Sequence, residues 1–108
     1  PGLLGVCIGG DRSDGLLEAK RQFLRPLSDR AADPVLAKLE RRLEREAAEL
    51  GIGPMGFGGR GTVMGIKVAA LARLPASYFV SVSYMCWACR RQGFRARPGD
   101  GSILRWLP

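Results

Sequence analysis

Hydrophobic residues follow a strand-like pattern in three parts of the 108-residue chain. Residues 3–8 are almost wholly apolar, which is typical of a short buried strand, and the glycines after them predict a turn. Residues 62–72 are apolar and rich in β-branched side chains. In residues 77–84 Tyr and Val alternate with Ser, apart from Phe79. The last two segments are therefore also predicted as strands.

Between the first two of these strands, the hydrophobic spacing predicts two helices. Ser13 or Asp14 could cap the first, which would run to about Arg25 and be stopped by Pro26. Its predicted apolar side consists of Leu16, Leu17, Phe23 and Leu24.

The second helix has the clearest signals in the sequence. Asp33 is a good N-cap, Pro34 suits the first helical position, and Gly51 can close the end. Apolar residues recur at helical spacing at Leu36, Leu39, Leu43, Ala47 and Leu50. The remaining positions mix both signs of charge, which predicts a solvated face made of Glu40, Arg41, Arg42, Glu44, Arg45, Glu46 and Glu49.

A glycine-rich segment, residues 51–62, links this helix to the strands. Glycine permits close approach of the backbone to a ligand, so the segment could be an active-site loop. A purely structural turn would explain its glycines about equally well. It is not a P-loop, because no Gly-Lys-Ser/Thr follows. The chain is therefore predicted to be an α+β fragment of a larger domain, with two helices followed by a glycine-rich loop and a small mixed β-sheet.

Charge and composition narrow the function without deciding it. Seventeen Lys and Arg face ten Asp and Glu, a net charge of +7. Most of the excess lies in residues 73–108, where six arginines face one aspartate. Such a patch suits phosphates, RNA or dicarboxylates, and equally a merely solvated surface. No run approaches the length of a membrane span.

The reactive residue types exclude several kinds of site. The chain has no histidine, so it cannot by itself carry Ser-His, Cys-His or His-metal chemistry. The three cysteines argue against a secreted disulfide framework and favour a reducing cytosol. Cys7 is expected to be a small buried thiol. Cys86 and Cys89 form a C-x-x-C whose spacing alone allows a thiol redox pair or an iron–sulfur ligand, whereas zinc would need further ligands.

Three segments together resemble the class I fumarate hydratases and the related tartrate dehydratases. Residues 4–10 are similar to that family's GVGIGG strand and turn. Residues 50–59 match its LGIGPxGxGG loop almost residue for residue. Residues 74–88 resemble the strand that ends in a cluster cysteine. The order and spacing of all three fit, so the resemblance covers nearly the whole chain.

The resemblance implies an iron–sulfur hydro-lyase that interconverts fumarate and (S)-malate. In this family three cysteines hold a [4Fe-4S] cluster, and Cys86 matches one of them. The open iron acts as a Lewis acid on the dicarboxylate substrate. Cys7 and Cys89 do not match the other ligands, which are expected outside this chain. The loop residues expected near the cofactor are Gly56, Gly58, Gly59 and Thr62.

The resemblance also implies how the chain fits into an enzyme. Residues 1–98 correspond to the C-terminal part of the α (cluster-binding) domain, and residues 99–108 to the linker toward a β domain or subunit. A cytoplasmic, homodimeric and oxygen-sensitive enzyme is expected, with the isolated fragment inactive. Family members usually carry a second loop threonine and a substrate-contacting histidine before the last strand. Here Arg73 lies in that histidine-free region and is a candidate cationic contact.

Three alternatives remain on sequence grounds. A tartrate or other hydroxy-acid dehydratase of the same family would share every segment quoted. A basic nucleic-acid-binding module would use the arginine-rich third of the chain, but Trp87, Phe94 and Trp106 are few for stacking. A thiol oxidoreductase would use Cys86 and Cys89.

Overall fold

The computed structural model describes residues 1–88 and 93–107 and has the predicted α+β architecture. Cys89, Arg90 and Arg91 lie outside the described residues. The helices are α1 (Arg12–Arg21) and α2 (Pro34–Glu49), with short 3₁₀ turns at Gln22–Leu24 and Pro54–Gly56. The strands are β1 (Gly2–Gly10), β2 (Val63–Arg73), β3 (Val80–Cys86), β4 (Gly93–Ala96) and β5 (Ile103–Leu107). No helix in the described part of the chain is long and apolar enough to cross a membrane.

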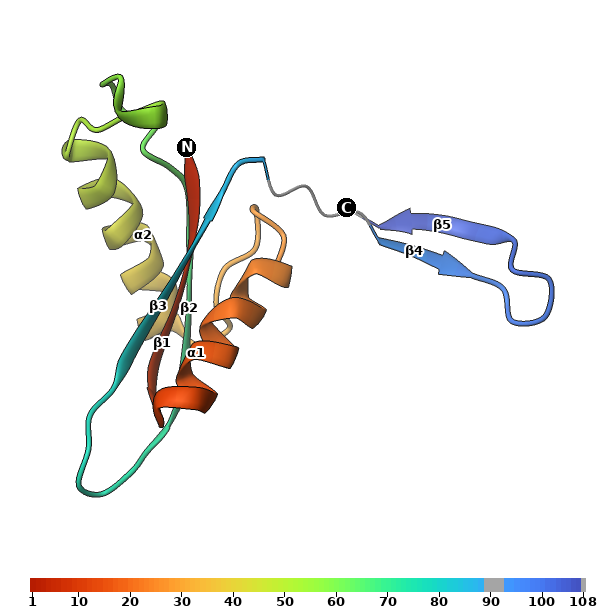
Figure 1. The fold of residues 1–108 in the computed structure, drawn as a ribbon, viewed down its shortest axis with the longest axis horizontal. Coiled ribbons are helices and arrows are strands. Elements are labelled where there is room, and N and C mark those ends of the chain that lie inside the picture. Colours follow the sequence, from red (N-terminus) through yellow and green to blue (C-terminus); the bar gives the residue numbers. More distant parts are fainter. Residues whose placement is uncertain (89–92, 108) are drawn as a thin grey trace.

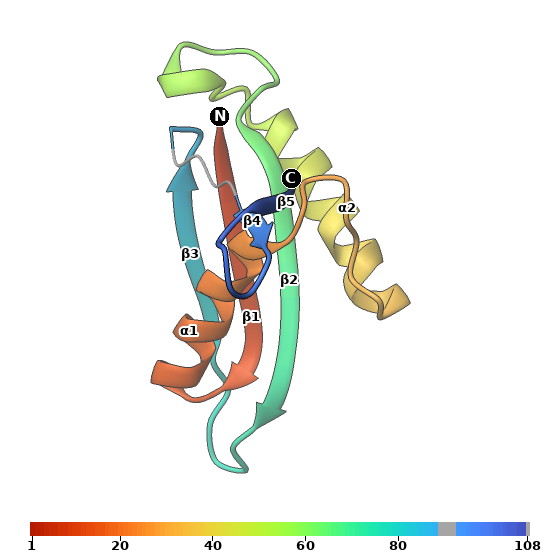
Figure 2. The same cartoon turned by 90° about the vertical axis from the view of Figure 1, so that its right-hand side faces the viewer.

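Strand β1 is the centre of a three-stranded sheet in the order β2-β1-β3. It runs parallel to β2 and antiparallel to β3, which makes the sheet mixed. Helices α1 and α2 lie on opposite sides of this sheet (Figure 1). Seen from the side, α2 runs along the β2 edge, whereas α1 lies over β1 and β3 (Figure 2). Strands β4 and β5 form a separate antiparallel hairpin.

Helix α1 packs on the sheet through small residues rather than through the predicted leucines. A Cβ added at Gly5 would lie 1.9 Å from the Ala19 carbonyl oxygen, so the helix backbone approaches β1 as closely as glycine allows. Ala19 and Phe23 are buried, as the sequence predicted for Phe23. The prediction was wrong for three leucines, since Leu16, Leu17 and Leu24 are exposed.

The N-terminus of α1 also differs from the prediction. The N-cap is Asp11, which precedes both predicted caps: its carboxylate accepts hydrogen bonds of 2.7 Å from the amides of Ser13 and Asp14. Ser13 and Asp14 are themselves inside the helix. A carboxylate at this position satisfies backbone donors that a helix start leaves unpaired.

Helix α2 begins and ends as predicted. The Asp33 carboxylate caps it through the Val35 amide, Pro34 occupies the first turn, and Gly51 follows the end with a φ of 66°. Its apolar stripe covers Val6, Ile66 and Val68, the centre of the core, with the side chains of Leu36, Leu39, Leu43 and Ala47. Leu50 departs from the stripe and is exposed.

Two glutamates of α2 contradict the predicted solvated face. Glu40 is fully buried, and Glu44 is half-buried against β2. Their carboxylates accept hydrogen bonds from the β2 amides of Val68 (2.9 Å) and Ile66 (3.1 Å). Four helical residues rise about 6 Å and two strand residues about 6.6 Å, so glutamates one turn apart can reach alternate amides of a strand. The outward edge of β2 is thereby covered by side-chain acceptors, which is one way to protect an edge strand.

Basic residues complete this network. Arg25 donates to Glu40 at 2.8 Å and to Asp29 at 2.7 Å, and Arg30 binds both oxygens of Glu44. The Lys67 ammonium is fully buried and donates to the carbonyls of Leu27 and Asp29. Burial lowers the pKa of Lys67, and the hydrogen bond from Arg25 lowers the pKa of Asp29. The loop between the helices is thus fixed by charge-assisted hydrogen bonds to α2 and β2.

We expect this network to make stability fall in acid. Burial raises the pKa of Glu44, but the hydrogen bonds from Arg30 and the Ile66 amide outweigh it, so the folded pKa lies below the ordinary one. The unfolded chain then binds more protons, and the stabilising contribution is lost as the pH falls below about 4.3 and through the folded pKa. Acid unfolding followed by circular dichroism should have a shallower pH dependence in Glu44→Gln. An unchanged profile would contradict this role.

Candidate active site

The described residues line an open cavity of about 440 Å³ at the end of the sheet where β1 begins and β3 ends. Four elements meet there: the start of β1, the end of α2, the glycine-rich loop and the end of β3. The lining residues are Pro1, Leu4, Ala47, Leu50, Ile52, Gly53, Met55, Gly56, Thr62, Val63, Tyr84, Cys86 and Trp87. The cavity therefore joins all three segments that the sequence singled out: the first strand through Leu4, the glycine loop, and the cysteine strand.

Backbone pairing fixes Cys86 at the cavity. Cys86 is the last residue of β3 and lies opposite Gly2 in the register with β1. The next residue, Trp87, donates its amide to the Pro1 carbonyl at 3.1 Å. The Tyr84 ring covers Gly2, because a Cβ added there would lie 2.1 Å from the ring. The exposed thiol of Cys86 is thus presented on a rigid strand end rather than on a loose loop.

The glycine loop is closed by hydrogen bonds across its neck. The Thr62 hydroxyl accepts from the Gly53 amide at 3.1 Å, and the Gly58 amide donates to the Ile52 carbonyl at 2.8 Å. Gly53 has a φ of 67°, and a Cβ there would lie 1.7 Å from the Gly58 carbonyl oxygen. No residue with a side chain fits this position without moving the loop.

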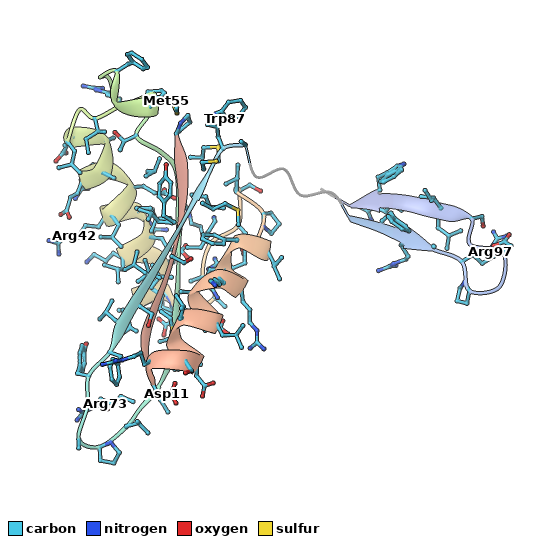
Figure 3. All side chains as sticks on the ribbon, in the orientation of Figure 1. Asp11, Arg42, Met55, Arg73, Trp87 and Arg97 are labelled. Carbon is cyan, nitrogen blue, oxygen red and sulfur yellow. The ribbon has the colours of Figure 1, made fainter. Side chains whose placement is uncertain are left out.

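Two large apolar side chains of the same loop stand outward. Met55 has a φ of 54° and is the non-glycine residue with a left-handed backbone in the described chain. Such backbone strain costs about 1 kcal/mol or more and concentrates at functional sites. Phe57 is 91% exposed. Met55 and Trp87 lie at the same end of the molecule (Figure 3).

The residues predicted for the site are not all brought together. Gly56 and Thr62 line the cavity beside Cys86, whereas Gly58 and Gly59 belong to the loop without lining it. Arg73 lies at the opposite end of the sheet, beside Asp11 (Figure 3). It pairs with Gly10, whereas Cys86 pairs with Gly2, so the two are separated by about 26 Å at roughly 3.3 Å per strand residue. The role of Arg73 stays a prediction.

Cys7 is the small buried thiol that the sequence predicted. It is fully buried, and burial together with the nearby Glu18 raises the pKa of its thiol. In the register of the sheet Cys7 pairs with Ser81, five positions from Cys86 and on the opposite face. These two cysteines cannot share a cluster within this fold.

The donor set of the cavity fits one ligand of an iron–sulfur cluster. A single thiol, that of Cys86, lines it, and no charged side chain does. Within residues 1–88 and 93–107 no three His, Cys, Asp or Glu side chains are grouped to hold a metal. A cluster held by several thiolates, or a dianionic substrate, would need further groups from outside these residues.

Comparison with known proteins now identifies the family. The family described as "Fumarate hydratase (Fumerase)" matches residues 1–95. The chain belongs to this fumarate hydratase family. Its members include hydro-lyases of both the fumarate hydratase and the tartrate dehydratase type.

Individual relatives cover most of the chain. It is 50% identical over 106 residues to a protein of Geobacillus stearothermophilus provisionally assigned as a class I fumarate hydratase. It is 40% identical over 95 residues to the L(+)-tartrate dehydratase subunit alpha of Escherichia coli UTI89, and 41% over 91 residues to that of strain K12. The matches cover 98%, 88% and 84% of this chain, but only 21%, 31% and 30% of these relatives.

Sequence reasoning missed several residues of the site. Leu50 and Tyr84 were expected on apolar faces, Met55 fell at a variable position of the family loop, and Trp87 was considered only as a stacking aromatic. Each lies within a segment that resembles the family, and that membership was the available signal. Periodicity could not show that the ends of α2 and β3 meet at one cavity.

Gly53 and Gly51 offer a matched test of the loop in a complete enzyme of this family. Both have a φ near 66°, but an added Cβ meets the Gly58 carbonyl at Gly53 and open space at Gly51. We expect Gly53→Ala to lower hydro-lyase activity by about tenfold or more, because misplacing a site by 1 Å can cost more than that. Gly51→Ala carries the same φ strain without the clash and should keep activity. Equal effects of the two substitutions would contradict a shaping role of the loop.

Proposed function

We propose that this chain is the C-terminal part of the α (cluster-binding) region of a class I fumarate hydratase, which interconverts fumarate and (S)-malate. Water would add across the substrate double bond, with the hydroxyl on one carbon and the proton on its neighbour. The observation that carries the proposal is the position of Cys86. The one exposed thiol among the described residues lies at a cavity bordered by the loop that resembles the family's glycine motif.

Cys86 would hold one iron of a [4Fe-4S] cluster, with the other cysteine ligands outside this chain. When bound, the cluster would supply an open iron that acts as a Lewis acid on the substrate hydroxyl and carboxylate. The fit rests on the donor type, because thiolates are the usual ligands of such clusters, and on the strand end that fixes the thiol.

The other residues of this chain would shape the site. The hydrogen bond between Thr62 and Gly53 holds the glycine loop in a conformation that leaves the cavity open. Leu50, Met55 and Tyr84 give the cavity an apolar lining, but all three side chains are exposed in this chain. Other parts of the enzyme would have to cover them before water is excluded and electrostatic interactions inside are strengthened. Since no lining side chain is charged, the cations that bind a dicarboxylate would come from outside this cavity. The isolated segment would then be inactive.

A tartrate dehydratase is the second candidate, because two relatives with 40% and 41% identity are subunits of that enzyme. The discriminating experiment uses the complete polypeptide, reconstituted anaerobically with iron and sulfide. Hydration of fumarate should exceed dehydration of L(+)-tartrate in kcat/KM. A preference for tartrate would replace the first substrate assignment, and the absence of any iron would contradict both.

The proposed role of Arg73 as a substrate contact has its own test. Arg73→Ala in the complete enzyme should raise KM for the dicarboxylate with kcat little changed, since it would remove a charge-assisted contact. Arg97→Ala, an exposed arginine of the β4–β5 turn, is the control. An unchanged KM would exclude the contact. That result would agree with the position of Arg73, at the opposite end of the sheet from Cys86.

The proposal also includes a cytoplasmic enzyme that acts as a homodimer and has a β domain or β subunit as partner. The Escherichia coli relative is the α subunit of its enzyme, which supports such a partner. A reducing compartment suits an exposed thiol ligand.

A further inference from the structure

The β4–β5 hairpin has features of a docking element that the proposed function does not use. It stands apart from the three-stranded sheet, and its strands contact mainly each other (Figure 1). A single two-stranded hairpin is marginally stable in water. We therefore expect contact with another protein surface to stabilise the β4–β5 hairpin.

The two faces of the hairpin differ in chemistry. Phe94 pairs with Trp106 across the strands, with the rings edge to face and their centroids 5.7 Å apart. Phe94 is 56% exposed and Trp106 is 55% exposed. The next pair, Arg95 with Arg105, points to the opposite face, because side chains alternate along a strand.

The arginine pair is unfavourable by itself. Like charges directly opposite each other destabilise a hairpin. Within the described ranges neither guanidinium forms an ion pair, whereas Arg97 in the same hairpin pairs with Asp100 at 3.7 Å. An acidic surface against this face would turn the repulsion into two charge-assisted contacts.

We propose that the β4–β5 hairpin docks on the β part, domain or subunit, of the same enzyme, with Arg95 and Arg105 on an acidic patch and Phe94 and Trp106 in an apolar groove. The inference rests on the proposed function, which requires such a β part. The family match ends at Arg95, inside the hairpin, while the longer Geobacillus match spans 98% of the chain. Trp and Arg are also the residue types that dominate binding energy at protein interfaces.

The geometry disfavours a nucleic acid as the occupant. Proteins that bind single strands stack bases on aromatic rings while cations beside the rings contact the phosphates. Here the rings and the arginines lie on opposite faces of one hairpin. A single strand could use one face but not both together.

The test is hydrogen–deuterium exchange in the complete enzyme, with Arg95→Glu/Arg105→Glu as the variant. The substitution keeps a like-charge pair, so the intrinsic stability of the hairpin is little changed and only the match to an acidic partner is reversed. We expect residues 93–107 to be protected in the unaltered enzyme and to exchange about tenfold faster or more in the variant. A segment of the β part should lose protection at the same time.

Arg41→Glu/Arg45→Glu, the same charge change on the exposed side of α2, is the matched control and should leave the hairpin protected. Free exchange of residues 93–107 in the unaltered enzyme would overturn the proposal. So would hairpin protection that disappears on dilution while the segment of the β part stays protected, which would indicate a second copy. Protection gained only with poly(U) or phosphatidylserine vesicles would also overturn it. Exchange is read without turnover, so failure of the docking and failure of the hydro-lyase assignment are distinguishable.

Discussion

Replacing Cys86 with serine in the complete enzyme is expected to abolish hydro-lyase activity and to reduce the bound iron. A serine hydroxyl is a much poorer ligand for an iron–sulfur cluster than a thiolate. Loss of even an outer partner of a metal ligand costs about 10–100-fold, so loss of the ligand itself should cost more than about 100-fold in kcat/KM. The measurements are fumarate hydration and the absorption of the anaerobically reconstituted protein.

Two other cysteines provide the controls for this variant. Cys7 is buried on the other face of the sheet, so Cys7→Ala should keep activity and iron, at a small cost in stability. Cys89→Ser tests the C-x-x-C, and we expect it to retain iron because Cys89 does not match a ligand of the family. If Cys86→Ser kept its iron and activity, Cys86 would not be a ligand. If Cys89→Ser failed equally, the two thiols would act as a pair.

The sequence was sufficient where a local rule decided the structure. Asp33 and Pro34 marked the start of α2 because capping depends on neighbouring residues alone. The alternation in residues 77–84 correctly predicted the strand β3. It did not predict that Val80, Val82 and Tyr84 would be exposed, because α2 covers β1 and β2 and leaves β3 open on that face.

Local rules failed where packing with a distant element decided the outcome. The predicted face of α1 assumed that the largest apolar side chains are buried. Instead Ala19 packs on Gly5, and the close approach leaves Leu16 and Leu17 outside. For the site, β2 separates the glycine loop from the cysteine strand along the chain, and β1, whose Leu4 also lines the cavity, lies between β2 and β3 in the sheet. Only this strand order brings the three motifs together.

Glu40 is the strongest example, since a charged residue in a mixed-charge helix was predicted to be solvated. Its burial depends on the edge of β2. There the Val68 amide lies two residues from the Ile66 amide that Glu44 binds, so Glu40, one helical turn from Glu44, can accept from it. A helical charge pattern carries no information about unpaired amides of a strand more than 20 residues away. The buried carboxylate is nevertheless satisfied, with Val68, Arg25 and Ala31 as donors.

We therefore expect Glu40→Ala to destabilise the fold by about 3 kcal/mol, the range for a broken buried ion pair. Three causes contribute: the Val68 and Ala31 amides lose their acceptor, Arg25 keeps Asp29 as its one carboxylate partner, and a small cavity forms. Glu40→Gln should cost less, because the amide oxygen can still accept one of these hydrogen bonds. Glu46→Ala, in an exposed pair with Arg42, should cost less than about 0.5 kcal/mol.

Hydrogen exchange of the β2 amides in the complete protein measures this effect locally. Loss of Glu40 should accelerate exchange at Val68 by about a hundredfold, because a 1.4 kcal/mol loss corresponds to roughly tenfold. The Glu46→Ala protein should exchange like the unaltered one. Equal exchange rates in the Glu40→Ala and Glu46→Ala proteins would mean that the β2 edge is protected by something other than this carboxylate. The same result would leave the buried charge of Glu40 without a structural role, because an apolar residue of similar volume would pack on the core at least as well.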